Sequence, residues 1–189
     1  MKRVFIIHGW DGYPAEGWFP WLKRELKKKG FQVTVPAMPE SAEPKIDTWL
    51  AHLTATVGEV DENTFFVGHS IGCQTILRFL ESLPDNQVAG GIVLVAGWIN
   101  RLDGDLSPEE LIIAKPWIET PINLSKVKQQ AKKFTAIFSD NDKFTRLTEE
   151  NKRIFGDELG AKIIVEHNRG HFSGSDGVTE LPGVLEVIK

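Results

Sequence analysis

Short apolar runs alternate along the chain with segments whose apolar residues recur at helical spacing. Six of the short runs predict β-strands, and several of them are apolar on both faces, which is typical of buried parallel strands. The predicted strands cover residues 4–7, 31–35, 65–67, 91–96, 134–138 and 162–165.

Amphipathic segments between these runs predict helices. The first covers 18–26 and ends before Gly30, the second covers 46–57, and the third follows Ser70. A later helix carries Leu147, Ile154 and Phe155, and the last covers 181–188. Alternating strands and helices predict an α/β fold, with about six parallel strands covered by helices on both faces, as a single domain over 1–189.

One connection is longer than a crossover requires. Residues 97–133 join two predicted strands, although a crossover helix needs only about a dozen residues. The segment contains Trp98, Trp117 and three prolines. An excess of this kind predicts a lid or a binding loop.

Composition narrows the possible partners and the compartment. The net charge is −4 and the chain has no dense basic block, which argues against a nucleic-acid partner. No apolar stretch is long enough to span a membrane, so we expect no membrane partner. The single cysteine, Cys73, excludes an internal disulfide framework, and we expect a cytoplasmic protein.

Gly68-His69-Ser70-Ile71-Gly72 has the most informative pattern in the chain. It matches G-x-S-x-G, in which a sharp turn between a strand and a helix exposes a nucleophilic serine. A predicted strand precedes the motif and a predicted helix follows it, which is the context that the motif requires. The sequence therefore predicts that Ser70 is a nucleophile.

A serine nucleophile needs a base, and the base needs an orienting acid. Only His167 and His171 follow Ser70, and we favour His171 because Gly170 lets its loop project over the sheet. The acid should follow a late strand, where Asp140 and Asp142 both qualify by position. We favour Asp142, because Asp140 is better placed to bond backbone amides within the turn.

A more remote alternative for the acid is Asp103 or Asp105, after the preceding strand. The oxyanion hole requires two backbone donors, for which we expect the amides of Ile71 and Trp10. His8 and His69 are expected to support loops by hydrogen bonding. Candidate substrate-binding residues are Gly9, Tyr13, Trp18, Trp98 and Trp117.

With these residues assembled, the chain resembles the α/β-hydrolases, and more narrowly the small serine hydrolases typified by retinoblastoma-binding protein 9 and bacterial YdeN. The resemblance rests on the elbow motif, Lys115-Pro116-Trp117, Asp142 and Gly170-His171-Phe172. It implies Ser70, Asp142 and His171 as nucleophile, acid and base, and a sheet without the antiparallel pair of larger α/β-hydrolases. Lys143 departs from the proline of many relatives, and 98–120 is longer than in the mammalian member.

The leading functional hypothesis is hydrolysis of a small-molecule carboxylic ester, or less favourably an amide, through an acyl-enzyme, with no cofactor or metal. A lyase or perhydrolase with the same triad is an alternative, because fold alone does not decide the reaction. A third hypothesis is a binding protein. Binding to a retinoblastoma-type pocket is not supported, because Leu-x-Cys-x-Glu is absent around Cys73, the only cysteine.

Overall fold

The computed structural model describes residues 1–104 and 106–189, which form an α/β fold around one parallel sheet. The strand order is β2-β1-β3-β4-β5-β6, and every neighbouring pair is parallel. The strands are β1 (Arg3–Ile7), β2 (Gln32–Thr34), β3 (Thr64–His69), β4 (Gly91–Val95), β5 (Phe134–Ser139) and β6 (Lys162–Glu166).

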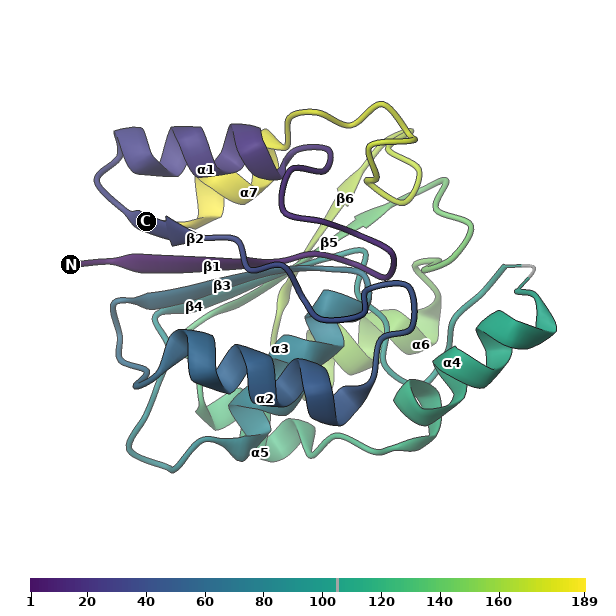
Figure 1. The fold of residues 1–189 in the computed structure, drawn as a ribbon, viewed down its shortest axis with the longest axis horizontal. Coiled ribbons are helices and arrows are strands. Elements are labelled where there is room, and N and C mark those ends of the chain that lie inside the picture. The colour runs from purple at the N-terminus through teal and green to yellow at the C-terminus, as the bar shows by residue number, and fades with distance from the viewer. Residues whose placement is uncertain (105) are drawn as a thin grey trace.

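Helices cover both faces of this sheet (Figure 1). On one face lie α1 (Phe19–Lys28) and α7 (Pro182–Val187), which contact each other. On the other face α3 (Ile71–Ser82) packs against α2 (Ile46–Val57) and α5 (Leu124–Gln129), with α6 (Glu149–Asn151) and the π-helical segment η1 (Lys152–Glu158) beside them. The predicted fold class is therefore confirmed.

The period of two in each strand divides the apolar side chains between two cores. In β1, Val4 and Ile6 enter the core beneath α1 and α7, whereas Phe5 and Ile7 enter the core beneath α2 and α3. The described residues of β3 are all buried, as expected for a central parallel strand.

The predicted elements agree with the observed ones to within a few residues at most ends. The main difference lies near Leu147, which precedes the late helix instead of belonging to it. Thr148 ends the preceding loop because its side chain accepts a hydrogen bond from the amide of Asn151 and caps α6.

The described residues of the long connection 97–133 include the helices α4 (Pro108–Glu119) and α5. Ser107 and Glu110 form a capping box at the start of α4, and Pro108 occupies the first turn. At the other end, Arg78 on α3 donates hydrogen bonds to the carbonyl oxygens of Trp117 and Thr120. These contacts hold α4 beside the carboxyl ends of the strands (Figure 1).

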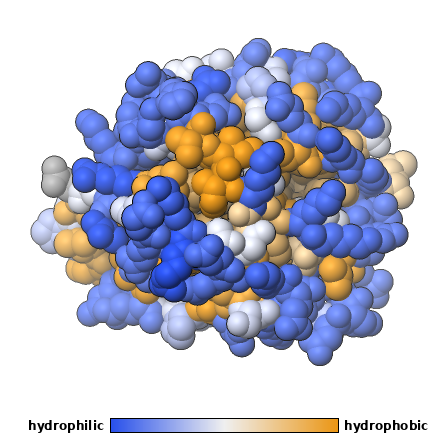
Figure 2. Space-filling model, turned by 180° about the vertical axis from the view of Figure 1, so that it is seen from behind, coloured by the Kyte–Doolittle hydropathy of each residue, from blue (hydrophilic) through white to orange (hydrophobic). Residues whose placement is uncertain are grey.

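Figure 2 shows the opposite side of the molecule, where the surface is largely hydrophilic with an apolar area near its centre. Val165, on the edge strand β6, is 41% exposed. Within residues 1–104 and 106–189, no helix has the length and apolar character needed to cross a bilayer. The same residues contain no group of three or more His, Cys, Asp or Glu side chains arranged to hold a metal ion.

Candidate active site

Ser70 lies at a sharp turn between β3 and α3. Its φ is +52°, a left-handed conformation that few non-glycine residues adopt, and its amide donates a 3.0 Å hydrogen bond to the carbonyl oxygen of Val95. A Cβ at Gly72 would lie 2.5 Å from the carbonyl oxygen of Ile7, so the start of α3 can approach β1 only without a side chain there. The predicted strand–turn–helix geometry is present.

His171 and Asp142 form a hydrogen-bonded pair. His171 Nδ1–H donates to Asp142 Oδ2 over 2.9 Å, and the Asp142 side chain is fully buried. Asp142 also accepts from the amides of Phe144 and Thr145 and from the Thr145 hydroxyl, at 2.8, 3.1 and 2.5 Å. Burial opposes ionisation of Asp142, but the hydrogen bond and charge of His171 outweigh it and hold the pKa below its ordinary value.

A second carboxylate–imidazole pair lies on the outside of the same turn. Asp140 Oδ2 accepts from His167 Nδ1 over 2.6 Å, and Asp140 Oδ1 accepts from the amide of Asn168 over 2.8 Å. The His167 side chain is 81% exposed. Asp140 thus bonds a backbone amide as expected, but across the neighbouring loop instead of within its own turn.

The remote alternative acid Asp103 forms an ion pair with Arg101, and Asp105 lies outside the described residues. Asp142 is thus the candidate acid in contact with His171.

The loop that carries His171 is shaped by Gly170 and Asp176. Gly170 has a φ of +55°, and a Cβ there would overlap the Asp176 carboxylate. That carboxylate accepts a 2.9 Å hydrogen bond from the amide of His171. Below the loop, the carbonyl oxygen of the buried Phe172 accepts a 3.0 Å hydrogen bond from Trp18 Nε1. Trp18 therefore supports the loop from within the core.

His69 supports the same loop from the elbow side. Its Nε2–H donates to the carbonyl oxygen of His171 over 2.7 Å, and the two ring centroids are 5.0 Å apart. Burial is the main cause that lowers the pKa of His69 to about 3, and the neighbouring His171 lowers it further. His69 is therefore neutral, with Nε2 as its donor.

His8 supports the loop after β1. Its Nδ1–H donates to the carbonyl oxygen of Gly9 over 2.8 Å, and its Nε2 accepts from the amide of Met38 over 3.0 Å. Burial lowers the pKa of His8. Both histidines thus make the loop contacts that the sequence predicts for them.

The two expected oxyanion donors lie on adjacent segments. Ile71 is the first residue of α3, where amides have no partner within the helix. Ile7 lies beside Gly68 in the sheet, so the loop containing Gly9 and Trp10 begins next to the elbow. Gly9 and Trp10 line the same cleft as Ser70.

That cleft has a volume of about 410 Å³. Ser70, His171 and His69 form its polar floor, with Gly9, Ser173 and the loop after β1 beside them. The other described lining residues are Trp10, Asp11, Glu16, Ala42, Leu102, Leu106, Glu109, Glu110, Ile113 and Phe144.

The expectation of a pocket lined by tryptophans needs correction. Trp18, Trp98 and Trp117 are each 1% exposed and belong to the packed core, because their large rings are worth more there than at a wet cleft. Trp117 instead anchors α4, since its Nε1 donates to the carbonyl oxygen of Pro44. Tyr13 is 57% exposed and lies outside the lining of the cleft.

The sequence predicts a lid or binding loop within 97–133, but it did not identify α4 or the residues by which this segment lines the cleft. Glu109, Glu110 and Ile113 line it, together with Leu102 and Leu106 from the preceding segment. The capping-box pattern Ser107-Pro108-Glu109-Glu110 was a readable signal for the start of this helix.

Comparison with known proteins gives the family. The serine hydrolase family matches residues 4–189. The protein YdeN of Bacillus subtilis (strain 168) is 32% identical over 187 residues, covering 99% of this chain and 94% of YdeN. The serine hydrolase RBBP9 of Rattus norvegicus is 25% identical over 190 residues, covering 99% of this chain and 94% of RBBP9.

Solved structures agree. The crystal structure of the B. subtilis ydeN gene product superposes with a TM-score of 0.89, covering 100% of this chain and 97% of that one. The structure of Est1E from Butyrivibrio proteoclasticus with bound ferulic acid has a TM-score of 0.72 at 14% identity, covering 100% and 90%, and shares the fold. The chain belongs to the serine hydrolase family and has the α/β-hydrolase fold.

Proposed function

We propose that this hydrolase cleaves small carboxylic esters, and amides less readily, through an acyl-enzyme on Ser70. His171 is the base and Asp142 orients it. The observation that carries the proposal is the 2.9 Å hydrogen bond from His171 Nδ1 to the buried Asp142. His171 lines the same cleft as Ser70, whose backbone is strained.

In the proposed reaction, His171 Nε2 accepts the Ser70 hydroxyl proton as Oγ attacks the ester carbonyl. Charge develops on the carbonyl oxygen, where the amides of Ile71 and Trp10 stabilise it. The imidazolium then protonates the leaving alkoxide, which leaves an acyl group on Ser70. Water, deprotonated by the same imidazole, releases the acid and restores the serine.

The protonation states of the neighbouring groups support these roles. Because the Asp142 pKa is held low, Asp142 is a carboxylate at neutral pH and can accept but not donate a hydrogen bond. Nδ1 of His171 therefore carries the ring proton, which leaves Nε2 free to accept one. Because His69 is neutral and donates to the backbone of His171, it fixes the loop without competing for the proton.

The size of the cleft supports a small-molecule substrate. A volume of about 410 Å³ is within the range of small-ligand sites. Leu102, Leu106, Ile113 and Phe144 supply apolar walls. These walls favour an acyl group or an alcohol with substantial apolar area.

A fluorophosphonate probe, followed by mass spectrometry of the adduct, tests the nucleophile. We expect a single adduct on Ser70, loss of labelling in Ser70→Ala, and a fall in turnover of p-nitrophenyl butanoate by about 10⁴-fold or more. Ser173 also lines the cleft, so it provides the internal comparison. An adduct on Ser173, or full turnover by Ser70→Ala, contradicts the proposal.

A further inference from the structure

The described wall of the cleft contains four carboxylates and no lysine or arginine. Asp11 and Glu16 come from the loop after β1, and Glu109 and Glu110 come from α4. The whole chain has 22 Lys and Arg against 26 Asp and Glu. The absence of lysine and arginine beside the four acids of the described wall is therefore a local arrangement, because the two charge types are nearly balanced in the chain as a whole.

Ion pairing distinguishes these acids from other acidic side chains. In the described chain, acids such as Glu25, Glu62 and Glu119 form ion pairs with lysines, whereas the four cleft acids form no ion pair. Glu110 is held by the amide of Ser107, over 2.7 Å, but hydrogen bonding leaves its charge in place.

Three basic side chains line a hollow that is separate from the cleft. Lys143, Arg146 and Lys152 line a separate hollow of about 450 Å³, which Asp142 also borders. The segregation means that the negative potential at the cleft is not cancelled by cations on its own wall.

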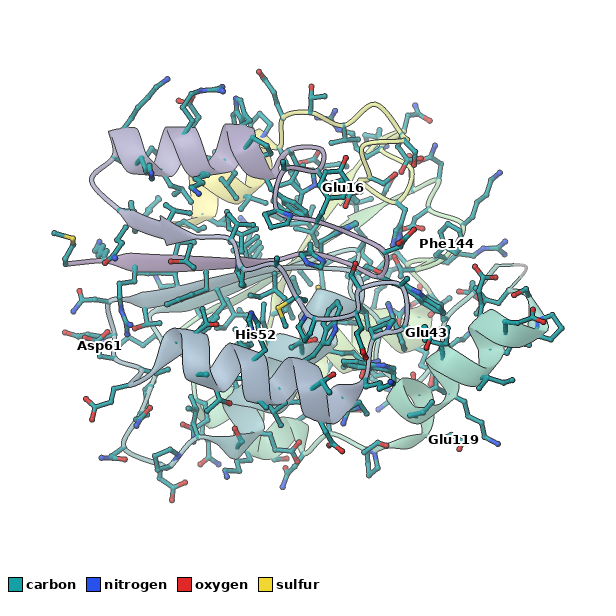
Figure 3. The ribbon with its side chains drawn as sticks, in the orientation of Figure 1. Glu16, Glu43, His52, Asp61, Glu119 and Phe144 are labelled. Carbon is teal, nitrogen blue, oxygen red and sulfur yellow. The ribbon has the colours of Figure 1, made fainter. Side chains whose placement is uncertain are left out.

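We propose that the cleft selects substrates that combine an apolar chain with a cationic group and discriminates against substrates that carry a carboxylate. This inference rests on the proposed ester hydrolysis and names its substrate class. Leu102, Leu106, Ile113 and Phe144 bind the apolar chain, while the carboxylates attract the cation. Figure 3 shows Glu16 and Phe144 near the carboxyl ends of the strands, with Glu119 at the lower edge of the molecule.

Three p-nitrophenyl esters of equal acyl-chain length, ending in methyl, trimethylammonium or carboxylate, test the selectivity. A second set places the same end groups on the alcohol of butanoate esters. We expect kcat/KM to be about tenfold higher for the cation than for the anion at about 10 mM ionic strength in at least one set. The ratio should shrink several-fold at about 500 mM, where screening is strong.

The double variant Glu16→Gln/Glu109→Gln should reduce the cation-to-anion ratio of kcat/KM about three- to fivefold. Glu119→Gln is the matched control, because Glu119 lies on α4 but pairs with Lys115 outside the cleft. Glu110 is left intact because it caps α4. A ratio that Glu119→Gln lowers equally contradicts the assignment to the cleft.

Calorimetry on Ser70→Ala provides a readout that does not depend on turnover. Octyltrimethylammonium should bind about tenfold more tightly than octanoate at low ionic strength, and the double variant should remove most of the difference. Equal affinities, or tighter binding of octanoate, overturn the inference. If the neutral ester is hydrolysed through Ser70 without any charge preference, only the selectivity fails; if no ester is hydrolysed, the proposed function fails.

Discussion

Replacing Asp142 by Asn tests the proposed mechanism with little change of shape. Asp142 Oδ1 accepts two amide hydrogens, from Phe144 and Thr145, so the oxygen of an Asn side chain must occupy that position. The Asn NH₂ group then faces Nδ1 of His171 in place of Oδ2. The Thr145 hydroxyl, which now donates to Oδ2, can rotate to accept from the NH₂.

This geometry forces the wrong tautomer on His171. The Asn NH₂ donates to Nδ1, so the ring proton moves to Nε2, which can no longer accept the Ser70 proton. Restoring the productive tautomer sets two donors against each other, at a cost of about 1–3 kcal/mol. The imidazolium also loses an opposing charge, worth about 4 kcal/mol at a separation of about 4 Å and an effective dielectric constant near 20.

These two terms overlap and together amount to about 4–6 kcal/mol, which corresponds to a fall in kcat of about 10³–10⁴-fold. Steady-state turnover of p-nitrophenyl butanoate measures the loss, and ¹⁵N NMR of the imidazole reports the tautomer. Circular dichroism should show that Asp142→Asn is folded, since its buried hydrogen bonds to Phe144 and Thr145 persist.

The neighbouring pair supplies a matched control. Asp140→Asn and His167→Ala disrupt a similar contact on an exposed side of the same turn and should leave kcat within about threefold. A fall in kcat of less than tenfold for Asp142→Asn, or an equal fall for Asp140→Asn, would refute the assignment of the acid.

Three further predictions concern the supports of the site. His69 has a pKa of about 3 in the folded state against 6.5 as its ordinary value, so the unfolded state binds the extra proton and stability falls as pH drops below about 6.5. In urea unfolding, this group should lower the free energy of unfolding by about 2 kcal/mol at pH near 5 relative to pH near 8. His69→Gln should weaken this dependence of the free energy of unfolding on pH. Arg78→Met should cost about 2–4 kcal/mol in urea unfolding, because the carbonyl oxygen of Trp117 is left buried without its donor. Gly170→Ala should lower kcat at least tenfold while the fluorescence spectrum stays native, because the loop that carries His171 must move to admit the Cβ.

The sheet and most of its helices were predictable because their signals are local. The run around Val67 is apolar on both faces, which predicts a strand buried on both sides, and the structure shows it buried. The elbow follows this strand directly. Chain order then placed candidate residues at the carboxyl ends of β5 and β6, since parallel strands bring those ends to one edge of the sheet. Gly170 and the position of Asp140 in its turn favoured Asp142 and His171 at the level of sequence, but the two separate carboxylate–imidazole pairs were visible only in the structure.

The walls of the cleft were not predictable in the same way. Trp98 and Trp117 lie in the segment that the sequence predicts as a lid or binding loop. Both are nevertheless buried, because a large aromatic ring gains more free energy in a core than at a surface. The sequence does not state which face of α4 turns inward: only Ala114 and Trp117 of its described residues are buried, so its amphipathic pattern is weak.

Contacts from distant segments decide that orientation. Arg78 on α3 binds the end of α4, and the carbonyl oxygen of Pro44 accepts from the Trp117 indole. These contacts turn Glu109 and Ile113 toward Ser70. The elbow at Ser70 therefore follows from a local motif, whereas the proposed charge selectivity depends on tertiary contacts between segments about 40 to 70 residues apart in sequence. Relatives that keep the elbow but change Arg78 or Pro44 should differ in substrate charge preference more than in mechanism, because the nucleophile and the cleft wall are held by separate contacts.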